Sequence, residues 1–137
     1  MINLVSYGDI SLYSGLDFAI QACALLKDDG IDFHYTIYTD DISNEMIRFN
    51  IFDLNLEDQI TVKGKDKVKV DKDSVILFSS TKIEEQVLED INSFHSKGLL
   101  VIASTVLAEE IDIYNNIYHF ESWSASSIVN CIKNNLL

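Results

Sequence analysis

The chain has 137 residues, of which 47% are hydrophobic, and its formal net charge is −12 at pH 7. This size and composition predict a single domain, residues 1–137, with a hydrophobic core, while the acidic charge excludes nucleic acid as a general partner because it repels phosphate. No apolar run approaches the roughly 18 residues of a membrane span, and the N-terminus has no signal-peptide pattern, so we expect a soluble, cytoplasmic protein.

The first half of the chain alternates short apolar strands with amphipathic helices. Ile2–Tyr7 predicts a strand, and the helix after it should end near Gly30. Residues 33–38 are aromatic and β-branched and predict a second strand. Residues 43–52 predict a second helix with Ser43 as its N-cap. We expect the inner faces of the two helices to carry Leu16, Ala19, Ile20, Cys23, Ala24 and Leu26, then Met46, Ile47, Ile51 and Phe52.

The second half predicts further strands at residues 59–62, 74–78, 99–103 and 117–120. A helix should span residues 81–95, and a closing helix residues 124–136. The helix at residues 81–95 has apolar residues at helical spacing, namely Ile83, Val87, Leu88, Ile91 and Phe94. The predicted order of elements is therefore βαβαββαββα.

Strands that are connected through helices imply right-handed crossovers and a mostly parallel sheet covered on both faces. We therefore predict an α/β fold, a Rossmann-like three-layer sandwich. Ligands bind such sheets outside the carboxyl ends of the strands. Function should then lie in the loops that begin at Tyr7, Thr39, Val62, Ser79 and Ser104.

Thiol and metal chemistry have little support in the sequence. Cys23 and Cys131 are isolated, which predicts two buried structural thiols, and the three histidines are scattered. Asp40 and Asp41 follow a strand and have the oxygen ligands that a divalent cation needs. No third carboxylate is placed beside them, so a solvated, helix-capping turn is the favoured interpretation. We expect no metal and no cofactor.

Four segments carry a resemblance to a known family. They are Gly15-Leu-Asp-Phe-Ala-Ile-Gln-Ala, Asp32-Phe-His-Tyr-Thr-Ile, Leu54-x-Leu-Glu-Asp-x-Ile-Thr-Val-x-Gly and Gly98-Leu-Leu-Val-Ile-Ala. Their order and spacing resemble the C-terminal, donor-nucleotide-binding domain of GT-B glycosyltransferases of family 4 (group 1). The resemblance implies transfer of a sugar, with retention, from a nucleotide sugar to a glycan or lipid acceptor. It also implies that the chain is not active alone, because an N-terminal acceptor domain or another protein chain must supply the other half.

Several polar positions of that family are changed in this chain. Asp9 and Ser14 stand where the family has an arginine and a lysine that face the donor pyrophosphate. Cations bind a diphosphate through charge-assisted hydrogen bonds, whereas an aspartate repels it. The glycine-containing turn after the second strand is replaced by Thr39-Asp-Asp-Ile. The Glu-x7-Glu signature keeps its first acid as Glu85, but Ser93 stands at the second position.

The resemblance implies donor-nucleotide contacts at Gly8, Gly15, Gly64, Lys65, Glu85 and Ser93. Ser93 would lie near the ribose, and the backbone amides of Gly64 and Lys65 near the base. The residues by themselves favour a plainer interpretation, in which Gly15 permits a tight turn and Glu85 belongs to a solvated helix face.

Lysines alternate at residues 63, 65, 67 and 69, so an extended segment would place all four on one face. Lysines at a sheet edge commonly prevent edge-to-edge pairing. The alternative is a local patch for an anion or a partner, since this is the one basic cluster of the sequence.

Besides the donor-binding half of a glycosyltransferase, which is the first hypothesis, two further hypotheses stay open. The lost cations and glycines favour a degenerate, non-catalytic glycosyltransferase-like module that acts through protein partners. The third hypothesis is a flavodoxin-like or receiver-like domain, for which Asp40 and Asp41 would lie at a strand end.

Overall fold

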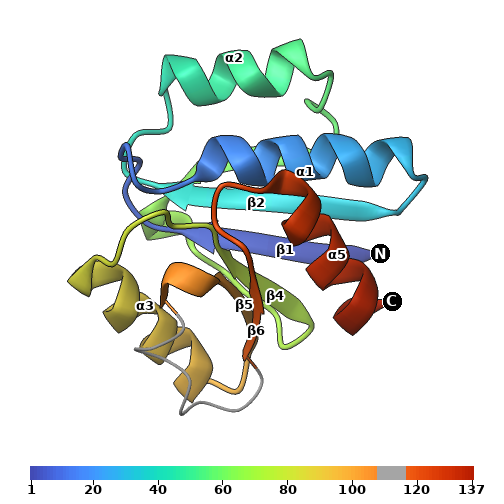
Figure 1. Ribbon diagram of the computed structural model, residues 1–137. Helices are drawn as coiled ribbons and strands as arrows, with labels where there is room; N and C mark the ends of the chain where they lie inside the picture. Colours follow the sequence, from blue (N-terminus) through green and yellow to red (C-terminus); the bar gives the residue numbers. More distant parts are fainter. Residues whose placement is uncertain (108–116) are drawn as a thin grey trace.

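The computed structural model describes residues 1–107 and 117–137. In chain order it contains β1 (Ile2–Tyr7), α1 (Leu16–Asp28), β2 (Phe33–Thr39), α2 (Glu45–Asp53), β3 (Ile60–Gly64), the 3-10 helix η1 (Lys65–Lys67), β4 (Ser74–Phe78), α3 (Glu85–Ser96), β5 (Leu100–Ser104), the 3-10 helix η2 (Thr105–Leu107), β6 (Ile117–Phe120) and α5 (Ala125–Leu136). The predicted order of strands and helices is confirmed (Figure 1).

The sheet has six strands in the order β3-β2-β1-β4-β5-β6, and all neighbouring strands are parallel. β4 is buried along its whole length, and after Ser74 its sequence is continuously apolar rather than alternating, as is typical of a strand covered on both faces. This order begins at an edge with β3-β2-β1, unlike the 2-1-3-4-5 order of flavodoxin-like folds. The flavodoxin-like or receiver-like hypothesis is therefore wrong.

Helices cover both faces of the sheet, as predicted. On one face, α1 and α5 pack beside each other and α2 packs against α1 (Figure 1). On the other face, Ile91 and Phe94 of α3 pack against Ile76 and Val101 of the sheet. The molecule is thus the α/β Rossmann-like sandwich that the alternating pattern predicts.

The two cysteines are confirmed as buried thiols. Cys23 on α1 and Cys131 on α5 lie in the same hydrophobic cluster. Burial raises the pKa of both thiols above the ordinary value, so the nucleophilic thiolate form is disfavoured.

The helix α2 differs from its prediction at both its start and its exposed face. Its N-cap is Asn44 rather than Ser43, because the Asn44 side chain accepts a hydrogen bond of 3.0 Å from the Ile47 N–H. Ile47 and Ile51 are buried as predicted. The prediction that Met46 and Phe52 face inward is wrong, since they are 57% and 67% exposed. The reason is that α2 packs mainly against α1, so only the stripe that holds Ile47 and Ile51 is covered.

Two further predictions near the carboxyl ends of the strands are corrected. α3 begins at Glu85 rather than at residue 81, and Ile83 is exposed in the loop before it. β3 extends to Gly64, and Lys65–Lys67 then form a 3-10 helix. Successive residues of a 3-10 helix are turned by about 120°, so the lysines do not share one extended face.

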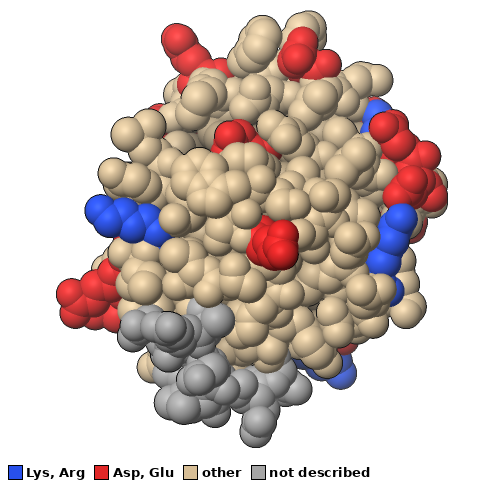
Figure 2. Space-filling view, viewed as in Figure 1, with Lys and Arg blue, Asp and Glu red and all other residues tan. Residues whose placement is uncertain are grey.

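The negative charge is distributed over the surface. Acidic side chains are scattered over the visible face of the molecule, and basic ones lie mainly at its margins (Figure 2). Within residues 1–107 and 117–137, no helix is both long and apolar enough to cross a membrane.

The cap assignment is testable by a pair of neighbouring substitutions. Asn44→Ala removes the acceptor of the Ile47 N–H and should lower the free energy of unfolding by about 1 kcal/mol, the usual cost of losing an N-cap. Ser43→Ala serves as the matched control and should leave stability within about 0.5 kcal/mol of the parent. Urea denaturation followed by circular dichroism measures both, and equal losses in the two variants would contradict the Asn44 cap.

Candidate functional site

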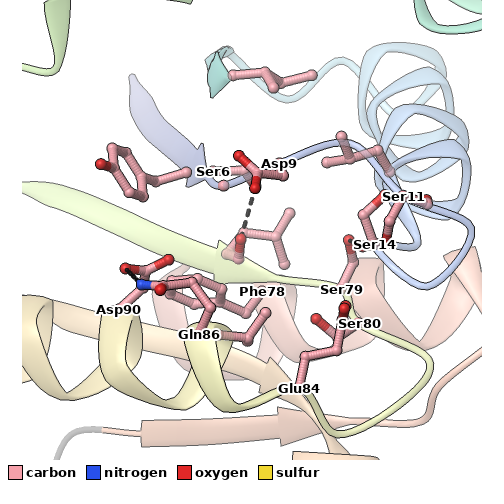
Figure 3. A pocket seen from close by; sticks show the side chains of 16 residues that line it. Ser6, Asp9, Ser11, Ser14, Phe78, Ser79, Ser80, Glu84, Gln86 and Asp90 are labelled. Carbon is pink, nitrogen blue, oxygen red and sulfur yellow. Dashed lines mark hydrogen bonds between the residues drawn. The ribbon is translucent and has the colours of Figure 1, made fainter. Parts of the chain in front are cut away.

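A pocket lies between β1 and β4, where the side of the sheet on which successive strands are added changes. β1 and β4 are neighbours, but β2 and β3 continue to one side of them and β5 and β6 to the other. The connections from the carboxyl ends of β1 and β4 therefore diverge and leave a crevice between them. The pocket in this crevice has a volume of about 100 Å³. Figure 3 shows Asp9 above it, Gln86 and Asp90 from α3 at its lower left, and Ser14 and Ser79 together on its right.

Hydrogen bonds fix the loop after β1 against the loop after β4. The Ser79 hydroxyl donates to the Ser14 carbonyl oxygen at 2.9 Å, and the Thr81 N–H donates to the Tyr13 carbonyl oxygen at 2.9 Å. Below them, the buried Ser6 hydroxyl donates to the Leu77 carbonyl oxygen at 2.6 Å. The two loops thus form one wall with a fixed spacing.

Gly15 is the closest point of approach between these loops. Its φ is +65°, in the left-handed region, and a Cβ atom there would lie 1.9 Å from the Ser79 carbonyl oxygen. Gly15 is also the N-cap residue of α1, directly before Leu16, and it provides no side-chain cap. Both the turn and the packing against Ser79 therefore require a glycine at this position.

The lining of the pocket is acidic. Asp9, Glu84 and Asp90 line it, and no lysine or arginine is among the described residues that do. The nearest cation is Lys65, at the start of η1, which forms an ion pair with Asp9. Its ammonium also lies 5.4 Å from the centroid of the Tyr7 ring. The hydrogen bond to Asp9 raises the pKa of Lys65, so the lysine stays charged while its charge is offset by Asp9.

Asp90, on α3, is one of the acidic residues that line the pocket. Burial raises the pKa of its carboxyl group, and the charges of Asp9 and Glu89 act in the same direction. A hydrogen bond of 3.1 Å from the Gln86 side-chain amide and the charge of Lys65 oppose this rise. The carboxylate is therefore held in an environment that disfavours its own charge and that of any other anion.

The structure brings some of the six expected contact residues together. Gly8 lines the pocket at the end of β1, but its N–H donates to the Tyr38 carbonyl oxygen at 3.0 Å and is already used. Lys65 contacts the loop after β1 through its ion pair with Asp9. Gly64, the residue before Lys65, is the last residue of β3. Gly15 lies behind the wall, against Ser79.

The other two expected residues lie outside this pocket. Glu85 is exposed and is not among the lining residues, whereas its neighbours Glu84 and Gln86 are. Ser93 lies farther along α3, beside a separate groove. Glu84 and Asp90 are lining residues that the sequence pattern did not single out as site residues; the signal available was their position on the segment that follows β4 at the carboxyl edge of the sheet.

The paired acids after β2 form a turn that caps α2. The Asn44 side-chain amide donates to Asp41 Oδ2 at 3.1 Å, and the Asn44 N–H donates to the Asp41 carbonyl oxygen at 3.2 Å. The Thr39 hydroxyl donates to the Asp40 carboxylate at 3.2 Å. These contacts fit the interpretation of residues 39–44 as a helix-capping turn.

Several solved structures with similar folds are named as glycosyltransferases. The chain is similar to the C-terminal domain of a glycosyl transferase group 1 family protein from Francisella tularensis, with 19% identity and a TM-score of 0.69 over 97% of this chain and 74% of that one. It is also similar to a glycosyltransferase from Rickettsia africae (19% identity, TM-score 0.72, 98% of this chain and 37% of that one). A third similar structure is sucrose-phosphate synthase from Thermosynechococcus elongatus (17%, 0.74, 98% and 36%). No family model matches the sequence, and no curated protein matches it significantly.

These similarities establish the fold. The chain has the fold of the C-terminal domain of GT-B group 1 glycosyltransferases, as the resemblance implies. It spans about three quarters of the isolated C-terminal domain but little more than a third of the other two chains.

The contact between Gly15 and Ser79 predicts a large effect of one methyl group. Gly15→Ala should lower the free energy of unfolding by roughly 2–4 kcal/mol, because the cost of a left-handed backbone at alanine adds to the cost of a clash with the Ser79 carbonyl oxygen. Gly30→Ala is the matched control: Gly30 has a φ of +72°, but no atom lies within 4 Å of the added Cβ. It should cost only about 1–2 kcal/mol. Equal losses in thermal or urea unfolding would show that the close approach is unimportant.

The environment of Asp90 predicts a pH-dependent effect on stability. A raised pKa in the folded state means that folding disfavours the ionised form, so the parent loses stability as pH rises from the unfolded value of about 3.9 through the folded pKa. Asp90→Asn avoids this loss and should raise the melting temperature at pH 7. The difference should vanish near pH 3, where Asp90 is protonated. Asp58→Asn, at an exposed position in the loop before β3, controls for the change in net charge because Asp58 is not among the groups that shift the pKa of Asp90. A gain that is the same at pH 3 and pH 7 would refute the explanation.

Proposed function

We propose that this chain is the donor side of a sugar-nucleotide glycosyltransferase and binds a nucleotide sugar at the pocket between β1 and β4. The observation that carries this proposal is the position of the pocket, at the carboxyl ends of the two strands where the sheet order reverses. The shared fold supports it, since similar solved structures are glycosyltransferases.

Each expected contact has a distinct task in this proposal. Gly8 lets the backbone approach the diphosphate, Gly15 holds the loops after β1 and β4 close together behind it, and Lys65 supplies positive charge once it leaves Asp9. Gly64 and Lys65 lie near the base. Ser93 faces the ribose, and the sugar lies toward the start of α3, where Glu85 is the expected acid and Glu84 is the acid that lines the pocket.

The acceptor side has to come from elsewhere in this proposal. The chain spans little more than a third of the Rickettsia africae and Thermosynechococcus elongatus chains. An N-terminal acceptor domain or another protein chain would complete the cleft, and the sugar would pass to a glycan or lipid acceptor with retention of configuration. The isolated domain should show donor binding but no transfer.

One observation favours a second candidate function. Asp9 offsets the charge of Lys65, and Asp9, Glu84 and Asp90 surround the place that a diphosphate would occupy. The negative charges of these three carboxylates repel the negative charges of a diphosphate. A degenerate, non-catalytic glycosyltransferase-like module that acts through a protein partner would have no need of this site.

The ion pair between Asp9 and Lys65 provides a direct test. Asp9→Asn removes one negative charge and frees one positive charge, and the gain of a charge-assisted hydrogen bond should raise the affinity for a nucleoside diphosphate about tenfold. The measurement is an amide NMR titration of the isolated domain with UDP, GDP and ADP. We expect saturable shifts at Gly8, Gly15 and Ser79 for one of the three nucleotides.

The control is Asp29→Asn, which breaks the similar ion pair between Asp29 and Lys133 at the amino end of the sheet. It changes the net charge by the same amount and should leave nucleotide affinity unchanged. If neither the parent nor Asp9→Asn shows shifts at the pocket, the donor-side proposal fails and the non-catalytic module becomes the better explanation.

A further inference from the structure

The helix α2 has two apolar faces, and only one of them is buried. Ile47 and Ile51 lie in the hydrophobic cluster that also contains residues of α1. Met46, Phe49 and Phe52 are instead 57%, 61% and 67% exposed. Because successive residues of a helix are turned by about 100°, these three side chains project from the side opposite to the buried pair. Figure 1 shows α2 at the upper margin of the molecule, beside α1.

The exposed face is a continuous apolar stripe. Met46 and Phe49 are three residues apart, as are Phe49 and Phe52, and side chains at this spacing are neighbours on the surface of a helix. Single exposed apolar side chains are ordinary on protein surfaces. Three large ones side by side on one short helix are typical of a surface that another molecule covers.

An acidic residue lies at each end of this stripe. Glu45 is the first residue of α2 and Asp53 the last, and both are exposed. Each is four residues from Phe49, so both lie on the same side of the helix as the stripe. Glu45 is favourable at the positive end of the helix dipole, but Asp53 lies at the negative end, where the last turn has no basic residue. Arg48, the one cation among residues 45–53, instead donates to the Ile42 carbonyl oxygen at 2.8 Å, before the helix begins.

These charges decide which partner fits the stripe. A cation beside Asp53 would be attracted both by the carboxylate and by the carbonyl end of the helix. A second copy of the chain lacks that cation. An antiparallel copy of α2 would bring Glu45 against Asp53, and a parallel copy would bring each acid against its own counterpart. The net charge of −12 also opposes self-association and repels an anionic membrane.

We propose that the exposed face of α2 is a docking surface for a cationic amphipathic helix of another protein. The apolar side of that helix packs on Met46, Phe49 and Phe52, and one of its lysines or arginines pairs with Asp53. The proposal does not rest on the donor site, because no residue of α2 lines the pocket between β1 and β4. Both an active donor half and a non-catalytic module can carry such a surface.

The test uses a synthetic peptide of the proposed chemistry, with leucine on one side of a helix and lysine on the other. A length of about 14 residues is enough to span the nine residues of α2. The peptide is titrated into the isotope-labelled chain and followed by amide NMR, and we expect saturable shifts at residues 45–53. A peptide of the same composition in scrambled order should bind about tenfold more weakly, because it has no apolar side. A version with glutamate in place of lysine should not bind, because Glu45 and Asp53 repel it.

Two pairs of variants test the two parts of the surface. Phe49→Gln removes the centre of the stripe and should weaken peptide binding about tenfold. Its matched control is Leu12→Gln, since Leu12 is 88% exposed in the loop after β1 and lies outside α2. Asp53→Asn should weaken binding about threefold, and this loss should shrink at high salt. Glu121→Gln, at an exposed position after β6, removes the same charge and should have no effect.

The outcomes separate this proposal from the other occupants and from the donor site. Equal losses for Phe49→Gln and Leu12→Gln, or no saturable shifts on α2, would overturn the docking surface. Sedimentation velocity of the chain alone tests a second copy, and a dimer that Phe49→Gln dissociates would also overturn it. Phosphatidylcholine vesicles test a lipid surface, and vesicle binding that Phe49→Gln abolishes would do the same. Shifts at Gly8 and Ser79 on addition of a nucleotide concern the donor site alone, so the two proposals fail independently.

Discussion

β1 pairs with β4 through Asn3, Leu4 and Val5, and this pairing joins parts of the chain that are far apart in sequence. Ser6 and Leu77, which are hydrogen-bonded just below the pocket, are separated by 71 residues. Because both strands are parallel and their connections diverge, the loops that leave them border one crevice. The contact between Gly15 and Ser79 then sets how close the two loops come. The pocket and the position of α3 follow from this pairing, whereas the ion pair between Asp9 and Lys65 depends on the pairing of β1 with β2 and of β2 with β3.

The electrostatics of the carboxyl edge divide it into two parts. The pocket between β1 and β4 has carboxylates in its lining, and the nearest lysine, Lys65, is held by Asp9. The neighbouring groove, beside Ser93, is lined by Lys69, Lys97 and Asp90, and neither lysine takes part in the ion pairs found among residues 1–107 and 117–137. Asp90 lies at the boundary, and its raised pKa reflects the burial and the acidic neighbours on that side.

The errors in the sequence prediction share one cause. Apolar periodicity shows that a helix has a face to cover, but it does not show which neighbour covers it or how wide the contact is. Met46 and Phe52 belong to the apolar set of α2, yet they are exposed because α2 packs mainly against α1. Lys65 fits an alternating pattern, yet a 3-10 turn directs it to Asp9. Both outcomes depend on contacts between segments that are distant in sequence.

The sequence by itself determined the order of strands and helices, the parallel sheet and the two buried thiols, because these follow from local periodicity and from the short connections between elements. It also located the loops at the carboxyl ends, including Gly8 and Ser79. Only the tertiary structure decided that Gly15 is packed against a carbonyl group, that Lys65 is paired with Asp9, and that Glu84 rather than Glu85 lines the pocket. Charge pairing and side-chain direction depend on distances across the sheet, and the sequence pattern of one segment carries no information about them.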